Sequence, residues 1–217
     1  LTANAPETKD NNFTWKDYQD RNNNELLAIF GNFVNRSLVL THKYFEGKVP
    51  AMVNLNEKDQ AAIEEMNQYP DKIAHLLDTY KFREALSELM NLARLGNRYL
   101  TENEPWKQFK TDPERVKTVL AVSLQIVAKL AILSEPFLPF SAKKLQAMIG
   151  LEVSGWNQAK ETVLLNENAT IGEVELLFTK VEDETVAAQV NKLEETKKQN
   201  ELNAWAPNPI KPNTNID

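Results

Sequence analysis

The chain has 217 residues, of which 42% are hydrophobic and 26% charged, and its formal net charge is −6 at pH 7. This composition is typical of a soluble globular protein with a substantial core. The acidic balance argues against nonspecific nucleic-acid binding, and we expect no DNA partner, although local patches leave selective RNA binding open. The sequence contains no cysteine, which excludes disulfides, thiolate nucleophiles and thiolate zinc sites.

The sequence was searched for membrane-spanning and signal segments. No run of 18 apolar residues occurs, so we expect no membrane partner. Leu1 is not preceded by Met and no signal segment follows it, which predicts a portion of a longer protein. Residues 1–13 are polar and irregular and are expected to lead into the fold.

A long first helix is predicted from Thr14, whose spacing to Asp17 resembles a capping box, to the break at Gly47 and Pro50. It would run for roughly 30 residues, as bundle helices often do. Its apolar residues follow one helical stripe, formed by Leu26, Phe30, Phe33, Leu40 and Tyr44.

Two shorter helices and a second long helix are predicted next. Asn56 is expected to cap a helix that stops near Tyr69, and residues 71–79 to add another turn or two. The long helix begins near Phe82 and ends before Pro105, because proline disfavours helix in the residue before it. Its stripe consists of Phe82, Leu86, Leu89, Ala93, Gly96 and Leu100.

Prolines also punctuate the rest of the chain. Pro113 suits the first position of another long helix, which extends to about Ser134. After the break at residues 136–139, Ser141 is predicted to cap a helix that ends at Gly150. The stripe of the long helix consists of Val116, Leu120, Leu124, Val127 and Leu130.

Together these elements predict an all-α fold, an antiparallel bundle of four or five helices. The bundle is assigned to residues 14–150, after the leading segment 1–13. Residues 151–200 are assigned to a short extended or clamp segment followed by an exposed amphipathic helix from residue 183. Residues 201–217 are rich in proline and are predicted to be a linker.

The sequence shows no catalytic machinery. The two histidines, His42 and His75, are far apart and no thiolate accompanies them, so no metal site is expected. The glycine-rich phosphate loops and the nucleophile-elbow motif are also missing from the sequence. We therefore expect a recognition domain without catalytic residues.

Asn32 and Arg36 form the first candidate for recognition. They are four residues apart on the first predicted helix, so their side chains project together, about one turn (roughly 6 Å) apart along the axis. An amide and a guanidinium suit the edge of an unpaired base, and arginine also binds phosphate. A solvated helix face with an internal hydrogen bond is the alternative interpretation.

Trp106 is the second candidate, because it follows the helix-ending Pro105 among polar and charged residues. A tryptophan on a polar rim can stack on a base, which contributes about 1–3 kcal/mol per base. The alternative is that Trp106 folds inward and caps the bundle. Asn97, Arg98 and Tyr99, with Arg94 one turn earlier, add a predicted basic and aromatic surface strip.

Four segments resemble, in order, the anticodon-binding domain of methionyl-tRNA synthetase, a class I aminoacyl-tRNA synthetase. The Asn-x-x-x-Arg pair alone is nonspecific, but its combination with the later segments is specific. The segments are APETKDNNFTWKDYQDRNNNELLAIFGNFVNR, LARLGNRYLTENEPW, EPFLPFSAKKL and LLFTKVEDETVAAQV.

The resemblance implies site residues and a partner. Asn32, Arg36 and Trp106 would recognise the first base of the CAU anticodon of tRNA(Met), with Pro105 fixing the approach of Trp106 and Asn97 supporting the pocket. Position 101 is often Asp in bacterial members of the family and is Thr101 here. No acidic contact is therefore expected at that turn.

The resemblance further implies a cytoplasmic methionine–tRNA ligase as the parent protein. ATP with Mg²⁺ and a zinc site would belong to a portion N-terminal to this chain, which itself would need no cofactor. A C-terminal domain could make the parent homodimeric. Two alternatives stay open: the equivalent bundle of another class I synthetase, for Ile, Val, Leu or Cys, or a helical protein–protein scaffold that uses the helix at 183–200.

Overall fold

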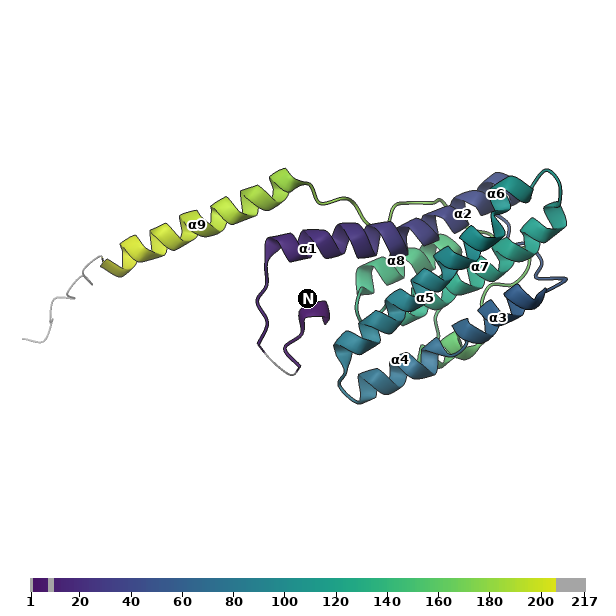
Figure 1. Ribbon diagram of the computed structural model, residues 1–217, viewed down its shortest axis with the longest axis horizontal. Coiled ribbons are helices and arrows are strands. Elements are labelled where there is room, and N and C mark those ends of the chain that lie inside the picture. Colours follow the sequence, from purple (N-terminus) through teal and green to yellow (C-terminus); the bar gives the residue numbers. More distant parts are fainter. Residues whose placement is uncertain (1, 8–9, 206–217) are drawn as a thin grey trace, which may run out of the picture.

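The computed structural model describes residues 2–7 and 10–205, and within them it contains helices and no strand. An isolated antiparallel bridge joins Lys48 to Thr170. The helices are η1 (Thr2–Asn4), α1 (Trp15–Arg21), η2 (Asn22–Gly31), α2 (Asn32–Phe45), α3 (Glu57–Met66), α4 (Tyr69–Asp78), α5 (Phe82–Asn103), α6 (Pro105–Gln108), α7 (Pro113–Leu133), α8 (Pro139–Ile149), η3 (Trp156–Lys160) and α9 (Asp183–Trp205). The predicted all-α class is confirmed (Figure 1).

The first long helix is present, but its middle is π-helical. The Thr14 hydroxyl accepts from the Asp17 amide at 3.0 Å, so the predicted N-cap is confirmed. The helix then passes without a break through α1, the π-helical η2 and α2. The π-helical segment has ten residues and ends directly before Asn32.

The predicted stripe of this helix is only partly correct. Phe30 and Phe33 are fully buried, whereas Leu40 and Tyr44 lie at the edge of the core. The buried face of α2 instead includes Ser37 and Thr41. Their hydroxyls donate to the Phe33 and Ser37 carbonyls at 2.9 and 2.8 Å, which satisfies them away from water and permits their burial.

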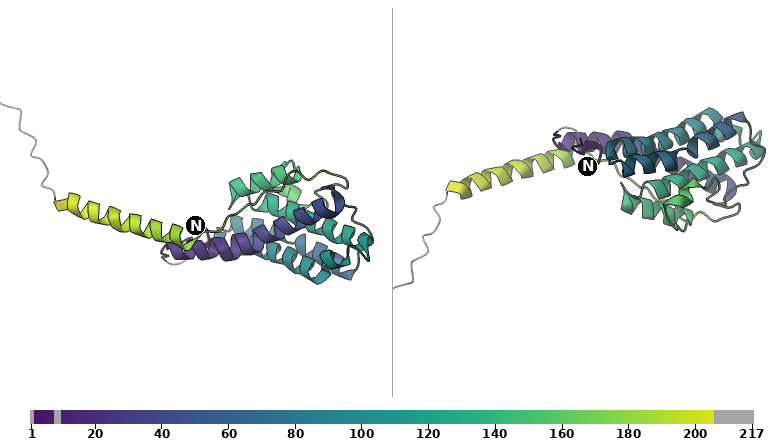
Figure 2. Two further views of the ribbon diagram at one scale, coloured as in Figure 1. Left: turned by 90° about the horizontal axis from the view of Figure 1, so that it is seen from above. Right: turned by 90° about the horizontal axis from the view of Figure 1, so that it is seen from below.

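Helix α7 forms the centre of the bundle, between α2, α5 and α8 (Figures 1 and 2). All five residues of its predicted stripe are buried, and so are the other residues of its C-terminal half. Its mean hydropathy of 1.9 over 18 residues would suit a membrane span by length and composition alone. However, 94% of that window is buried within the protein, as in the core helix of a bundle.

Helices α5 and α2 approach closely at Gly96. A Cβ atom built there would lie 2.3 Å from Cζ of Phe33, so only glycine fits beneath this ring. The predicted stripe of α5 is buried at Leu89, Ala93, Gly96 and Leu100, but Phe82 is exposed. The stripe therefore predicts the core face of α5 correctly, except at its first turn.

Two predicted boundaries are wrong. Helix α8 starts at Pro139 and not at a Ser141 cap, because proline itself occupies the first helical position, where no amide is needed. Helix α9 continues to Trp205, so residues 201–205 belong to it and not to the linker; no proline occurs between its first residue, Asp183, and position 207. The rest of the predicted linker lies outside the described residues.

Residues 151–182 pack on the bundle as an irregular clamp. The Gln125 amide group of α7 bonds the backbone of Leu164 and Leu165, and the Lys129 ammonium donates to the Ala159 and Glu161 carbonyls. The end of the clamp, residues 179–181, is held through its backbone by side chains of α1 and η2, namely Gln19, Asn22 and Asn23. From there α9 projects away from the bundle (Figures 1 and 2).

Candidate nucleic-acid interface

The chain turns sharply at the step from α5 to α6. Helix α5 ends at Asn103, and Glu104 adopts the left-handed conformation, with φ 39° and ψ 54°. Its amide donates to the Leu100 carbonyl at 3.0 Å, and the buried Pro105 starts the short helix α6. Trp106 is thereby held at the far end of the bundle from α1, with 37% of its surface exposed (Figure 1).

Arg36 and Trp106, which are 70 positions apart in the sequence, lie together in the structure. The guanidinium carbon of Arg36 is 4.8 Å from the centroid of the Trp106 ring, a cation–π contact. Asn32 is exposed one turn earlier on the same helix. The structure therefore brings Arg36 and Trp106, both expected at one base-binding site, into direct contact, and Trp106 does not fold into the core.

Asn97 has a different place from the other candidates. Its side-chain amide donates to the Ile29 carbonyl at 2.8 Å and to the Ala93 carbonyl at 3.2 Å. It thus ties α5 to the end of the π-helical segment, three residues before Asn32. Because both amide hydrogens are engaged with backbone, Asn97 can support the position of Asn32 but has no donor free for a base.

The predicted basic and aromatic surface strip is only partly present, because its aromatic residue, Tyr99, is buried. Tyr99 is only 3% exposed, because its hydroxyl donates to the buried carboxylate of Asp59 at 2.5 Å. Arg98 is paired with Glu65 at 2.6 Å, and Lys107, next to Trp106, pairs with Glu104 at 2.7 Å. The basic residues around Trp106 are therefore partly neutralised by neighbouring carboxylates.

A buried polar network that sequence reasoning missed lies beneath the Trp106 turn. Arg115 of α7 donates to both Asp59 oxygens, at 2.5 and 2.7 Å, and to Oδ1 of Asn103 at 2.6 Å. Burial alone would raise the pKa of Asp59, but hydrogen bonds from Arg115, Tyr99 and Asn56 outweigh it and lower the pKa. The Asp59 carboxylate is therefore ionised and fully paired.

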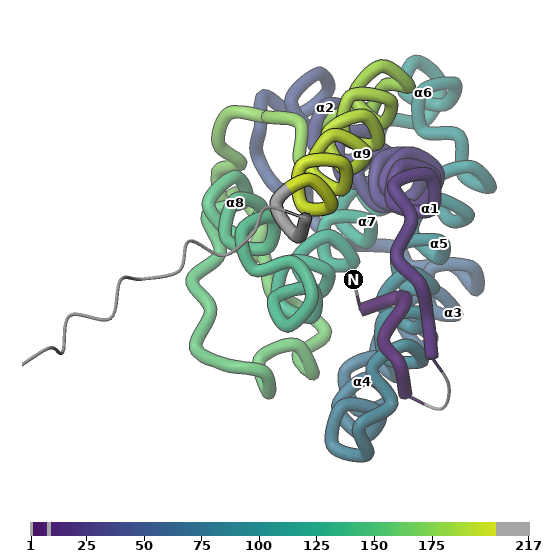
Figure 3. Tube along the Cα trace, turned by 90° about the vertical axis from the view of Figure 1, so that its left-hand side faces the viewer, coloured from purple at the N-terminus to yellow at the C-terminus, as the bar shows by residue number. Residues whose placement is uncertain are grey.

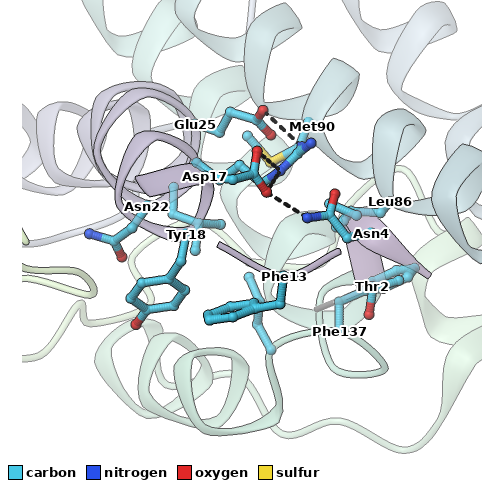
Figure 4. A pocket seen from close by; sticks show the side chains of 14 residues that line it. Thr2, Asn4, Phe13, Asp17, Tyr18, Asn22, Glu25, Leu86, Met90 and Phe137 are labelled. Atoms are coloured by element: carbon cyan, nitrogen blue, oxygen red, sulfur yellow. Dashed lines mark hydrogen bonds and ion pairs between the residues drawn. The ribbon is translucent and has the colours of Figure 1, made fainter. Parts of the chain in front are cut away.

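A small cavity lies at the other end of the bundle. It encloses about 130 Å³ between the N-terminal segment, α1 and η2, and Phe13, Tyr18 and Phe137 contribute apolar walls (Figure 4). Asn4 and Arg21 both donate to Asp17 at its rim. No predicted site residue lines this cavity, and the described part of the chain contains no metal-binding group of three or more acidic, His or Cys residues.

Solved structures show the same fold. A crystal structure of the free form of Mycobacterium tuberculosis methionyl-tRNA synthetase matches with a TM-score of 0.76 over 83% of this chain and 37% of that chain. The methionyl-adenylate complex of the same enzyme matches with a TM-score of 0.72. The identities are 22% and 24%, so these likenesses define the fold, that of a helical domain within methionyl-tRNA synthetases.

Sequence comparisons define the family. Residues 49–198 match the family described as the anticodon binding domain of methionyl tRNA ligase, and residues 1–38 match the family of class I tRNA synthetases (M). The chain therefore belongs to the anticodon-binding domain family of methionyl-tRNA ligase. This family match favours the methionyl bundle over those of the other class I synthetases considered above.

Curated relatives are similar along the whole chain. The methionine–tRNA ligase of Phocaeicola vulgatus is 57% identical over 98% of this chain, and that of Cytophaga hutchinsonii is 54% identical over 100% of it. The chain spans 31% and 32%, respectively, of the lengths of these two relatives. Arg36 and Trp106 are found in separate family matches and meet only in the fold.

Proposed function

We propose that this chain reads the CAU anticodon of tRNA(Met) and that Asn32, Arg36 and Trp106 form the contact for its first base. The cation–π contact between Arg36 and Trp106 is the observation that carries this proposal. It brings a planar cation and an exposed indole together at the protein surface. A splayed base needs that combination, an aromatic face for stacking and donors for its edge.

Each side chain has a separate role in this proposal. The indole of Trp106 stacks on the unpaired cytosine, and Pro105 fixes the backbone that carries it. Asn32 and Arg36 bond the edge of the base or its phosphate, because amide and guanidinium groups match these acceptors and donors. Asn97, whose amide holds the backbone beside Asn32, is a supporting residue and not a base contact.

The parent protein in this proposal is a methionine–tRNA ligase that works in the cytoplasm. The relatives carry that name along lengths that exceed this chain about threefold. Their class of enzyme uses ATP, and the ATP-binding and methionine-binding residues would lie outside this chain. The role of the present residues is then selection of the correct tRNA by its anticodon.

Replacement of Trp106 by alanine tests the proposed role of its ring. Because Trp106 is 37% exposed and lies outside the buried core, we expect the variant to stay folded, with a lower melting temperature. We expect the binding free energy for a CAU stem-loop to weaken by about 1–3 kcal/mol, the contribution of one stacked base. Fluorescence anisotropy with a labelled stem-loop measures the affinity, and circular dichroism measures the melting temperature.

Trp156→Ala is a matched control, because its indole donates to the Pro70 carbonyl on a different part of the bundle. This variant should lose stability and retain the affinity of the folded protein for the stem-loop. Unfolding of the Trp106→Ala variant, or unchanged affinity, would contradict the proposal. In the second case the helical-scaffold interpretation would become the better one.

A further inference from the structure

The turn that carries Trp106 is closed by a buried side-chain link. Asn103 is the last residue of α5, and Arg115 lies in the first turn of α7, so the segment between them includes α6 and Trp106. The Arg115 guanidinium donates to Asn103 Oδ1 at 2.6 Å across this segment. The amide of Asn103 donates in turn to the Tyr99 carbonyl at 2.8 Å, which fixes its orientation.

Asp59 holds the arginine in place from a third helix. Its two oxygens accept from Nη1 and Nη2 of Arg115, the bidentate geometry that only arginine provides. They also accept from the Tyr99 hydroxyl and from the Asn56 amide, where Asp59 completes the capping box of α3. The ends of α3, α5 and α7 are thus joined at one buried carboxylate.

The members of this network offer little surface to RNA, and their polar groups are already engaged with one another. The side chain of Asp59 has 0% exposure and that of Arg115 has 15%, while Asn103 is 5% exposed. A buried ion pair of this kind contributes little net stability compared with apolar residues of the same volume, because desolvation offsets the attraction. The segment that this network spans, from Asn103 to Arg115, carries the Glu104–Trp106 turn.

We propose that Asn103 and Arg115, held by Asp59, are positioning residues for the Trp106 platform and thereby set the selectivity for the first anticodon base. The inference rests on the proposed function of Trp106. The Asn103–Arg115 hydrogen bond fixes the distance between the end of α5 and the start of α7. The indole between them is therefore presented to the base in one orientation. Loss of this bond leaves the bundle folded but lets the turn move.

Two single variants cut this hydrogen bond in different ways. Asn103→Ala removes the acceptor, and Arg115→Lys keeps a cation beside Asp59 but loses the fork that reaches Asn103. We expect each variant to lower the ratio of affinities for CAU over GAU stem-loops by about five- to ten-fold, within the usual range for coupling through a packed network. The double variant should lower the ratio no further, because both changes break the same bond.

Gln125→Leu is the matched control. It breaks buried hydrogen bonds from α7 to residues 164 and 165, about ten residues along the same helix from Arg115, and should lower the melting temperature without changing the ratio. If the Asn103→Ala and Arg115→Lys variants fold and keep the wild-type ratio of CAU to GAU affinities, the positioning role is wrong. The proposed function of Trp106 would not be affected by that result. An equal loss in Gln125→Leu would overturn it as well, because the effect would then follow stability. A wild-type chain that does not distinguish the two loops would refute both proposals.

Discussion

Lys129 and Gln125 of α7 are buried polar residues whose side chains bond the irregular backbone of the clamp, and Lys129 carries a charge. Its side chain is fully buried in α7, and its ammonium donates to two loop carbonyls at 2.6 and 2.7 Å. Desolvation lowers the pKa of Lys129 to about 8, although Glu161 partly opposes this shift. No sequence pattern indicates this burial, because a lysine in an apolar helix usually marks the solvent face.

Lys129 should make the stability of the chain depend on pH. Its folded pKa of about 8 lies below its ordinary value of 10.5, so between these values the unfolded chain binds more protons. Stability should therefore rise with pH across this window, by on the order of 1–2 kcal/mol between pH 7 and 9.5. Urea unfolding of the wild type and of Lys129→Met at both pH values measures the difference. The account is wrong if the two proteins respond to pH in parallel.

At the scale of single residues, the candidate site was predictable from the sequence only in part. The residue types at Asn32, Arg36 and Trp106 suggest base recognition, and the structure brings Arg36 and Trp106 into contact. The Asp59–Arg115–Asn103 network was not predictable. Its members are 12 to 56 positions apart, and nothing in their local sequence distinguishes them from surface residues.

At the scale of helices, apolar periodicity and proline positions predict most of the elements. They fail where local backbone geometry decides the boundary. Apolar spacing predicts a helix through Asn22–Gly31 but not its π-helical geometry, and the four-residue helix Pro105–Gln108 is too short to show a periodic signal. The backbone path of the clamp at 151–182 has no periodic signal either, because its backbone pairs with side chains and loop backbone of the bundle.

The contact between α2 and α5 gives a prediction at this scale. Alanine at position 96 would favour the helix by up to about 1 kcal/mol in an open setting. Here its methyl group would collide with the fully buried Phe33 ring, and overpacking of this kind typically costs about 1–3 kcal/mol. Gly96→Ala should therefore lower the free energy of unfolding, as measured by urea denaturation. In a Phe33→Leu background the same change should be neutral or stabilising; a loss of equal size in both backgrounds would show that the ring is not the cause.

At the scale of the whole molecule, the two candidate features lie at opposite ends of the bundle. Trp106 occupies the end formed by α6 and the C-terminus of α2, and the cavity with the N-terminal segment occupies the end from which α9 projects (Figures 1 and 3). The family match to class I tRNA synthetases (M) covers residues 1–38, which line much of that cavity. The proposed base-recognition site thus lies at the opposite end of the bundle from the start of this match, although Asn32 and Arg36 fall within its last residues.

The central claim is that this chain selects the first anticodon base, and a stem-loop titration tests it most directly. The 217-residue chain is titrated with seven-nucleotide loops that carry CAU or GAU, at low salt and again at higher salt. We predict that the CAU loop binds more tightly than the GAU loop by about 1–3 kcal/mol, the usual free-energy cost of one wrong base. Both loops should bind more weakly as the salt concentration rises. Equal affinity for the two loops, or no binding of either, would contradict the claim.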